Sequence, residues 1–156
     1  ITQRFAYLLE ATYFLSLARR GDVEHVHAHF GRNAASVAMV MKNLGGPTFS
    51  MTVHGPDEFD YTMGHELGAK VVASAFTAAI SHYTTAQLRR WVPLEHWNKL
   101  EVIHCSVDET FFEASEPIAE GCTTFTCLGR LCPQKGQLLL PDAFAALLNN
   151  GHVTTL

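Results

Sequence analysis

Two cations follow an apolar segment near the end of the chain. The segment Thr124–Gly129 ends at a glycine, Arg130 comes directly after it, and Lys135 precedes a second apolar stretch. We interpret this as a buried strand followed by a helix, which places both cations beside free N–H groups at the positive end of the helix dipole. A guanidinium offers phosphate oxygens a planar fork, and an ammonium offers a point charge. The pattern predicts a phosphate-binding site, and the alternative is a pair of solvated loop charges.

A histidine stands at the end of another apolar segment. His54 follows Thr48–Val53 and precedes Gly55 and Pro56, a turn in which the missing side chain lets a ligand approach the backbone. A neutral imidazole can both donate to and accept from sugar hydroxyls. A lone histidine at a strand end is commonly structural, but the turn that follows His54 favours a contact with a sugar.

Other polar residues near these strand ends have plainer roles. The loop after His54 carries three carboxylates, at Asp57, Glu58 and Asp60. Carboxylates can bind sugar hydroxyls, but an acidic loop is commonly a solvated turn, so we assign none of them to catalysis. Asn33 and Ser36 begin a predicted helix, where capping is the ordinary role and contact with an acceptor is the alternative.

Three histidines alternate along one short segment, at His25, His27 and His29. On a strand they would share one face, and three imidazoles on one face could ligate zinc or another transition metal. The alternate spacing of the histidines supports a shared face but does not itself indicate a metal, because histidine-rich strand edges also occur beside solvent-filled pockets. We therefore predict no metal site.

The chain alternates between strand-like and helix-like segments. Strands are predicted at His25–His29, Thr48–Val53, Thr77–Ser81 and Leu100–His104, and helices at Phe5–Ala18, Asn33–Asn43, His65–Ser74 and Thr84–Trp91. This alternation is typical of an α/β fold with a parallel sheet that helices cover on both faces. Ligands of such sheets collect at the carboxyl ends of the strands, where His29, His54, His82 and Arg130 are expected.

Periodicity is lost after residue 108. We assign residues 1–108 to one domain, 109–122 to a linker that contains Pro117 and Gly121, and 123–156 to the start of a second domain. That second domain would hold the strand Thr124–Gly129, a helix near Gln137–Asn149 and a strand at His152–Leu156. Pro141 lies early in the predicted helix, so we expect the regular helix to start late.

Composition excludes several classes of protein. Hydrophobic residues make up 47% and charged residues 17%, which is typical of a globular chain. A net charge of −4 without a basic stripe argues against nucleic acid as a partner. The four cysteines lack the paired spacing of a structural zinc site. The apolar run Phe5–Ala18 is shorter than the roughly 20 residues that span a membrane, so we expect a buried helix.

Three motifs together resemble those of the retaining nucleotide-sugar glycosyltransferases of family 4. They are Thr52–Asp60, Val102–Asp108 and Gly129–Gly136, and their order and spacing most resemble the bacterial members that build exopolysaccharides such as colanic acid and amylovoran. The resemblance implies the GT-B architecture, in which two Rossmann-like, doubly wound domains face each other across a cleft.

The same resemblance implies roles for particular residues. Gly129, Arg130 and Lys135 would hold the donor diphosphate without a metal ion or other cofactor, and His54 would be the catalytic residue beside the donor sugar. Further contacts with the sugar or acceptor would come from Gly55, His29 and Asn33.

The activity implied is a hexosyltransferase-type reaction. A sugar would pass from a nucleotide-diphosphate sugar to an oligosaccharide, lipid-linked in our expectation, with retention of anomeric configuration. The site of the reaction would be the cytoplasm, with possible peripheral association of the full-length protein at the cytoplasmic face of the inner membrane. Two alternatives stay open at this point: a nucleotide-sugar epimerase or phosphorylase of the same architecture, and a sugar-binding fragment without turnover.

The chain departs from the family pattern in three places. A Gly-rich loop before the first predicted strand and the Glu-x₇-Glu motif of the second domain are absent from the sequence, and Cys105–Ser106 replaces a turn that is often Asn-Gly. We therefore expect an internal fragment, truncated at both ends and inactive by itself.

Overall fold

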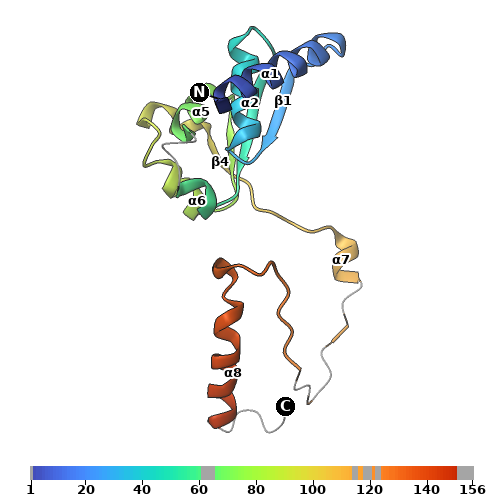
Figure 1. Ribbon diagram of the computed structural model, residues 1–156, viewed down its shortest axis with the longest axis vertical. Coiled ribbons are helices and arrows are strands. Elements are labelled where there is room, and N and C mark those ends of the chain that lie inside the picture. Colours follow the sequence, from blue (N-terminus) through green and yellow to red (C-terminus); the bar gives the residue numbers. More distant parts are fainter. Residues whose placement is uncertain (1, 61–65, 114–115, 118–120, 122–123, 151–156) are drawn as a thin grey trace. The chain divides into compact units, whose positions relative to one another are not determined.

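The computed structural model describes residues 2–60, 66–113, 116–117, 121 and 124–150 (Figure 1). The chain divides into two compact units, residues 1–106 and 107–156, which we describe one at a time. The assignment of residues 1–108 and 123–156 to two Rossmann-like domains, joined by a linker at 109–122, stays a prediction.

Unit 1 is built on a four-stranded parallel sheet. The strands are β1 (His25–His29), β2 (Thr48–Val53), β3 (Thr77–Ala79) and β4 (Leu100–Val102), in the spatial order β1-β2-β3-β4. In the register of β1 and β2, His25 lies beside Thr48 and His29 beside Thr52. The predicted strands are confirmed, and the α/β class with them. β1 and β2 have the predicted bounds, while β3 and β4 end two residues earlier than predicted.

Helices precede the sheet and connect its strands. They are α1 (Thr2–Arg20), α2 (Asn33–Asn43), α3 (Pro56–Phe59), α5 (Leu67–Ala73), α6 (His82–Leu88) and the 3₁₀ helix η1 (Leu94–Lys99). Helix α2 has the predicted bounds, and its C-cap residue Leu44 precedes a glycine with positive φ. The side chain of Ser81 caps α6 by accepting from the N–H of Thr84 at 3.1 Å.

The connecting helices share one face of the sheet. Their buried residues form a single hydrophobic cluster with the strands: Ala28, Ala35, Met51, Val53, Leu67, Val71, Ala79, Leu88, Val92 and Leu100. Strand order is the cause, because right-handed crossovers that advance in one direction place every helix on the same side. The described residues thus differ from the prediction of helices on both faces, and a doubly wound sheet stays a prediction.

Helix α1 packs on α2 (Figure 1). Ala11, Leu15 and Ala18 are buried against α2. The remaining surface of α1 carries exposed apolar side chains: Phe5, Leu8, Leu9, Tyr13, Phe14 and Leu17. The expectation of a buried helix is therefore wrong for these residues, because only the alanine-rich side lets the two helices approach closely. No helix in the described part of the chain combines the length and apolarity needed to span a membrane.

Unit 2 is mainly helical where it is described. It contains α7 (Glu109–Glu113), the 3₁₀ helices η2 (Pro133–Lys135) and η3 (Gln137–Leu139), and α8 (Leu140–Asn149). The late helix start is confirmed, since Pro141 lies in the first turn of α8, where its missing N–H costs no hydrogen bond.

The predicted strand at Thr124–Gly129 is wrong, because that segment has no strand structure. A strand requires a hydrogen-bonded neighbour, and the described residues of unit 2 contain no strand to pair with. Phe125 instead contacts the ring of Phe144 on α8, with centroids 5.3 Å apart. Cys127, within this segment, is an exposed free thiol. The second predicted strand, His152–Leu156, lies outside the described residues.

Candidate functional site

A histidine stands at or after the carboxyl end of every strand of the sheet. His29 is the last residue of β1, His54 follows β2, and His82 and His104 come after β3 and β4. Because the strands are parallel, their carboxyl ends share one edge, which confirms that the sequence segments at His29, His54 and His82 group there. This edge is where parallel α/β sheets bind ligands.

The structure brings His29 and His54 into direct contact. His29 Nδ1 lies 3.4 Å from His54 Nε2, so one imidazole can donate to the other in the appropriate tautomers. The ring of Phe30 lies against His54, with centroids 4.5 Å apart. Phe30 has a φ of 69°, a left-handed conformation that is uncommon for a bulky residue. Such strain is concentrated at functional sites, where the surrounding structure maintains it.

Glu58 holds the backbone of two loops from inside the protein. It is the third residue of α3 and is 2% exposed. Its carboxylate accepts from the N–H groups of His54, at 2.6 Å, and Gly55, at 3.3 Å, as in a capping box. The same carboxylate accepts from the N–H of Gly31. Glu58 is therefore not part of a solvated acidic turn, whereas Asp57 and Asp60 are exposed.

Lys70 supplies the opposite charge to the same loop. It lies on α5, is 1% exposed, and donates to the carbonyl oxygens of Gly31 at 2.8 Å and Arg32 at 3.0 Å. Burial lowers the pKa of Lys70 to about 8, while the carboxylates of Glu66 and Glu58 act in the opposite direction. A neutral amine keeps two N–H donors, so both carbonyl contacts survive loss of the proton.

We expect the stability of the protein to depend on the protonation of Lys70. Its ordinary pKa of 10.5 applies to the unfolded chain, so between pH 8 and 10.5 the unfolded state binds more protons than the folded state. Stability should therefore rise through this window, by about 1–3 kcal/mol, and the gain should disappear as the pH falls through 8. Urea unfolding of the protein and of Lys70→Met at pH 7.5–10.5 measures this, because the variant lacks the titrating group. Parallel stability curves for the two proteins would contradict the prediction.

Gly31 is confined from several sides. A Cβ atom at this position would lie 2.4 Å from Leu67 Cδ1, 3.2 Å from a carboxylate oxygen of Glu58 and 3.4 Å from Val53 Cγ2. Leu67 and Val53 are fully buried, so neither can move away freely. The absence of a side chain at Gly31 is therefore what lets the loop approach the Glu58 carboxylate.

Gly55 has a different relation to its surroundings. Its φ of 149° lies in the region that favours glycine, and a Cβ there would meet no atom within 4 Å. Gly55 itself is buried, so approach of a ligand to this peptide and a sugar contact at Gly55 stay predictions.

Asn33 is occupied by a contact within the protein. Its Oδ1 accepts from the hydroxyl of Tyr7 at 2.7 Å, which links α2 to α1. Asn33 does not cap α2, because the N-cap position belongs to Arg32 and no side-chain cap bond is present there. A role for Asn33 in acceptor binding stays a prediction.

The histidines of β1 form a hydrogen-bonded row with the hydroxyls of β2, as their alternation predicted for a shared face. His25 contacts Thr48 and Ser50, each at 2.8 Å, and His27 contacts Ser50 at 2.7 Å and Thr52 at 2.8 Å. Burial lowers the pKa of His27, and the neighbouring His29 and His25 lower it further. Both nitrogens of His25 and of His27 thus have hydroxyl partners. Within the described residues, no three His, Cys, Asp or Glu side chains gather in a group that could hold a metal ion.

Unit 2 brings Gly129 and Lys135 together. A Cβ on Gly129 would lie 3.7 Å from Cγ and 3.8 Å from Cδ of Lys135. Gln137 closes the turn by donating to the carbonyl oxygen of Arg130 at 2.7 Å. Both cations are exposed, and they are the only Lys or Arg residues after Ser106 in the sequence. Their side chains are available to an anion, although the strand that was predicted to present them is not formed.

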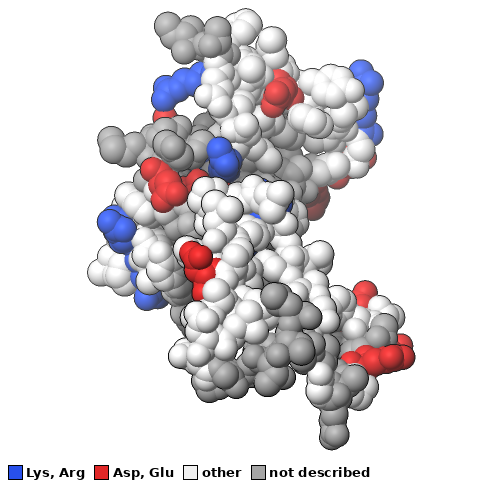
Figure 2. All heavy atoms as spheres, turned by 60° about the horizontal axis from the view of Figure 1, so that its bottom comes forward, with Lys and Arg blue, Asp and Glu red and all other residues white. Residues whose placement is uncertain are grey.

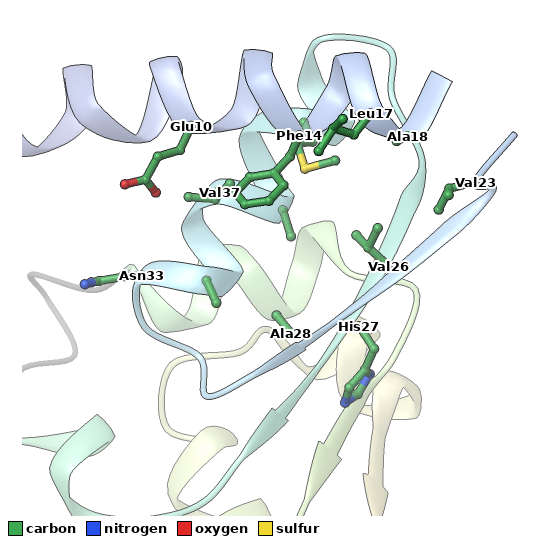
Figure 3. Close-up of a pocket in the computed structure, with 13 residues that line it drawn as sticks. Glu10, Phe14, Leu17, Ala18, Val23, Val26, His27, Ala28, Asn33 and Val37 are labelled. Carbon is green, nitrogen blue, oxygen red and sulfur yellow. The ribbon is translucent and has the colours of Figure 1, made fainter. Parts of the chain in front are cut away.

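An apolar groove of about 610 Å³ lies between α1, β1 and α2. Figure 3 shows Phe14 and Val37 in this space, with Glu10 and Asn33 at one end and His27 directed away from it. A sugar or nucleotide needs several polar partners, which this lining does not provide. The groove is therefore not part of the candidate site.

Sequence reasoning missed three of the residues that shape the edge. Phe30 and Lys70 are not among the predicted site residues, and Glu58 is predicted only as one of three similar carboxylates in the loop after His54. A signal existed for Glu58, because a glutamate three residues after the glycine at the start of a helix fits the capping box. No local signal distinguishes Lys70, since its partners lie nearly 40 residues earlier in the chain.

Charged side chains are dispersed on the face drawn in Figure 2, where cations and carboxylates are interspersed.

A scan of protein-family models and a search of curated proteins both find no match to this chain.

Proposed function

We propose that this chain belongs to a retaining nucleotide-sugar glycosyltransferase of the GT-B architecture. The enzyme transfers a sugar from a nucleotide-diphosphate donor to a lipid-linked oligosaccharide acceptor in exopolysaccharide synthesis, at the cytoplasmic face of the membrane. The observation that carries this proposal is the turn at His54, which stands at the carboxyl edge of a parallel sheet with open space beside Gly55. The turn is held from within by a buried carboxylate.

Sugar chemistry suits the groups on this edge. Imidazoles donate to and accept from hydroxyl groups, and Phe30 adds an aromatic surface beside His54. In the reaction, the bond between the anomeric carbon and a diphosphate oxygen breaks, the acceptor oxygen bonds to that carbon, and the acceptor hydroxyl proton passes to the departing diphosphate. His54 orients the donor sugar while the acceptor is held near the anomeric carbon.

The leaving diphosphate needs positive charge as it departs. Arg130 and Lys135 supply it in this proposal, in place of a metal ion. Support comes from the position of the Lys135 stem, which would lie within 4 Å of a Cβ on Gly129, and from the exposure of both cations. Arg130 and Lys135 are the only Lys or Arg residues after Ser106 in the sequence. The other charged residues of this part of the sequence are six carboxylates: Asp108, Glu109, Glu113, Glu116, Glu120 and Asp142.

We expect Arg130→Ala and Lys135→Ala each to lower the rate of sugar transfer about 10- to 100-fold in the full-length protein. Loss of one charge-assisted contact to the leaving group corresponds to about 1.5–3 kcal/mol. Gln134→Ala is the matched control, because Gln134 is an exposed neutral residue in the same turn as Lys135. Turnover within twofold of the unmodified protein for both cation variants would remove the assignment.

The product decides between this reaction and its relatives. A panel of nucleotide sugars with an oligosaccharide acceptor, followed by mass spectrometry, distinguishes transfer from isomerisation of the donor. Addition of phosphate tests for phosphorolysis in the same assay. A donor that binds but is never consumed would indicate sugar binding without catalysis.

A further inference from the structure

Two buried charged groups are not used by the proposed reaction. Glu58 is 2% exposed and Lys70 is 1% exposed. Burial of a charge is unfavourable unless other groups compensate it. Among the described residues the ion pair within 4 Å joins Arg4 to Glu66, so Glu58 and Lys70 do not satisfy each other directly. Their compensation comes from the backbone.

The two groups act on one peptide segment from opposite sides. The Glu58 carboxylate accepts from the N–H of Gly31, while the Lys70 ammonium donates to the carbonyl oxygen of the same residue. Both backbone hydrogen-bonding groups of Gly31, the N–H and the carbonyl oxygen, are thereby bound. A second bond from Lys70 to the carbonyl oxygen of Arg32 extends this hold by one residue.

Glu58 also connects this segment to the neighbouring strand end. Its other carboxylate oxygen accepts from the N–H of His54 at 2.6 Å and from the N–H of Gly55 at 3.3 Å. One carboxylate thus spans the loop after β1 and the turn after β2. His29 and Phe30 lie at the first of these two positions and His54 lies at the second.

We propose that Glu58 and Lys70 are a pair of positioning residues, which together fix the loop at residues 30–32 against the turn at His54. They thereby set the contact of His54 with His29 and with Phe30. Neither residue touches the substrate in this proposal. The effect on sugar transfer rests on the proposed function, whereas the effect on the two histidines does not.

Matched variants test the proposal. Glu58→Gln removes the negative charge and replaces one of the two accepting oxygens with an amide donor. Lys70→Met removes both hydrogen bonds to the backbone carbonyl oxygens. Asp57→Asn is the control for Glu58, because Asp57 is exposed in the same turn. Lys99→Met is the control for Lys70, because Lys99 also donates to two backbone carbonyl oxygens, those of Val72 and Ser74 at the end of α5.

The readout is the NMR spectrum of the histidine rings. We expect the ring signals of His29 and His54 to shift in Glu58→Gln and Lys70→Met, and the cross-relaxation between Phe30 and His54 to weaken. Both features should stay unchanged in Asp57→Asn and Lys99→Met. Unchanged His29 and His54 signals in the folded test variants would overturn the proposal.

A measurement on the unmodified protein keeps the test decisive if a variant does not fold. The amide protons of Gly31 and His54 should exchange with solvent at least 100-fold more slowly than those of an unprotected loop, because both are bound to a buried carboxylate. Free exchange of both amides would overturn the proposal without any variant.

Kinetics separate positioning from the proposed function. In the sugar-transfer assay with the full-length protein, we expect Glu58→Gln to lower kcat about 10-fold or more with the donor KM within twofold. If the unmodified full-length protein transfers no sugar, the proposed function fails, and the NMR result still decides whether the pair positions the histidines.

Discussion

Replacement of His54 by alanine is expected to lower sugar transfer by about 100- to 1000-fold, while the affinity for the nucleoside diphosphate stays within about twofold. The physical reason is a division of roles. His54 belongs to unit 1 and contacts the donor sugar in the proposed reaction, whereas the diphosphate is bound by Arg130 and Lys135 of unit 2. A group that orients the reacting sugar contributes to the transition state more than to binding of the nucleotide.

Initial rates and isothermal titration calorimetry measure the two quantities separately. His96→Ala is the matched control, because His96 lies in η1, away from the carboxyl edge of the sheet. It should leave both the rate and the affinity unchanged. A loss of nucleotide affinity in His54→Ala as large as its loss of rate would show that the division of roles is wrong.

Replacement of Gly31 by alanine is expected to lower the free energy of unfolding by about 2–4 kcal/mol. The added methyl group would lie 2.4 Å from Leu67 Cδ1, in a core that has no room for it. It would also press on the Glu58 carboxylate, which accepts from three backbone N–H groups. Displacement of that carboxylate leaves buried donors without an acceptor, so the cost exceeds that of the steric contact alone.

Gly21→Ala is the control for this prediction. A Cβ at Gly21 would have ordinary contacts of 3.7 Å with Leu17 and Val23, and its φ is not positive. We expect its free energy of unfolding to stay within about 1 kcal/mol of that of the unmodified protein. Chemical denaturation measures both variants, and equal stabilities for the two would contradict the account of Gly31.

The helices and strands of unit 1 could be predicted because their signals are local. Strand β2 is a run of β-forming residues that ends at a Gly-Pro turn, and α2 ends before a pair of glycines and a proline. The position of His54 at a strand end follows from the same local pattern. Such signals act through the backbone of neighbouring residues and require no distant partner.

Other features depend on partners that a local pattern does not contain. The segment Thr124–Gly129 resembles a strand, yet a strand forms only where a neighbour supplies hydrogen bonds. Helix α1 is apolar on several sides, and only its contact with α2 determines that Ala11 and Ala18 are buried while Phe5 is exposed.

In unit 1, the sequence by itself therefore determined the order of the strands, the parallel sheet and the histidines at its carboxyl edge. Tertiary structure decided which polar residues shape that edge. Asp57 and Glu58 are adjacent and chemically similar, but only Glu58 points to the N–H groups of Gly31 and His54. Its burial, like that of Lys70, is set by a loop about 30 residues or more away in the chain, and a charge is stable inside a protein only where such a loop compensates it.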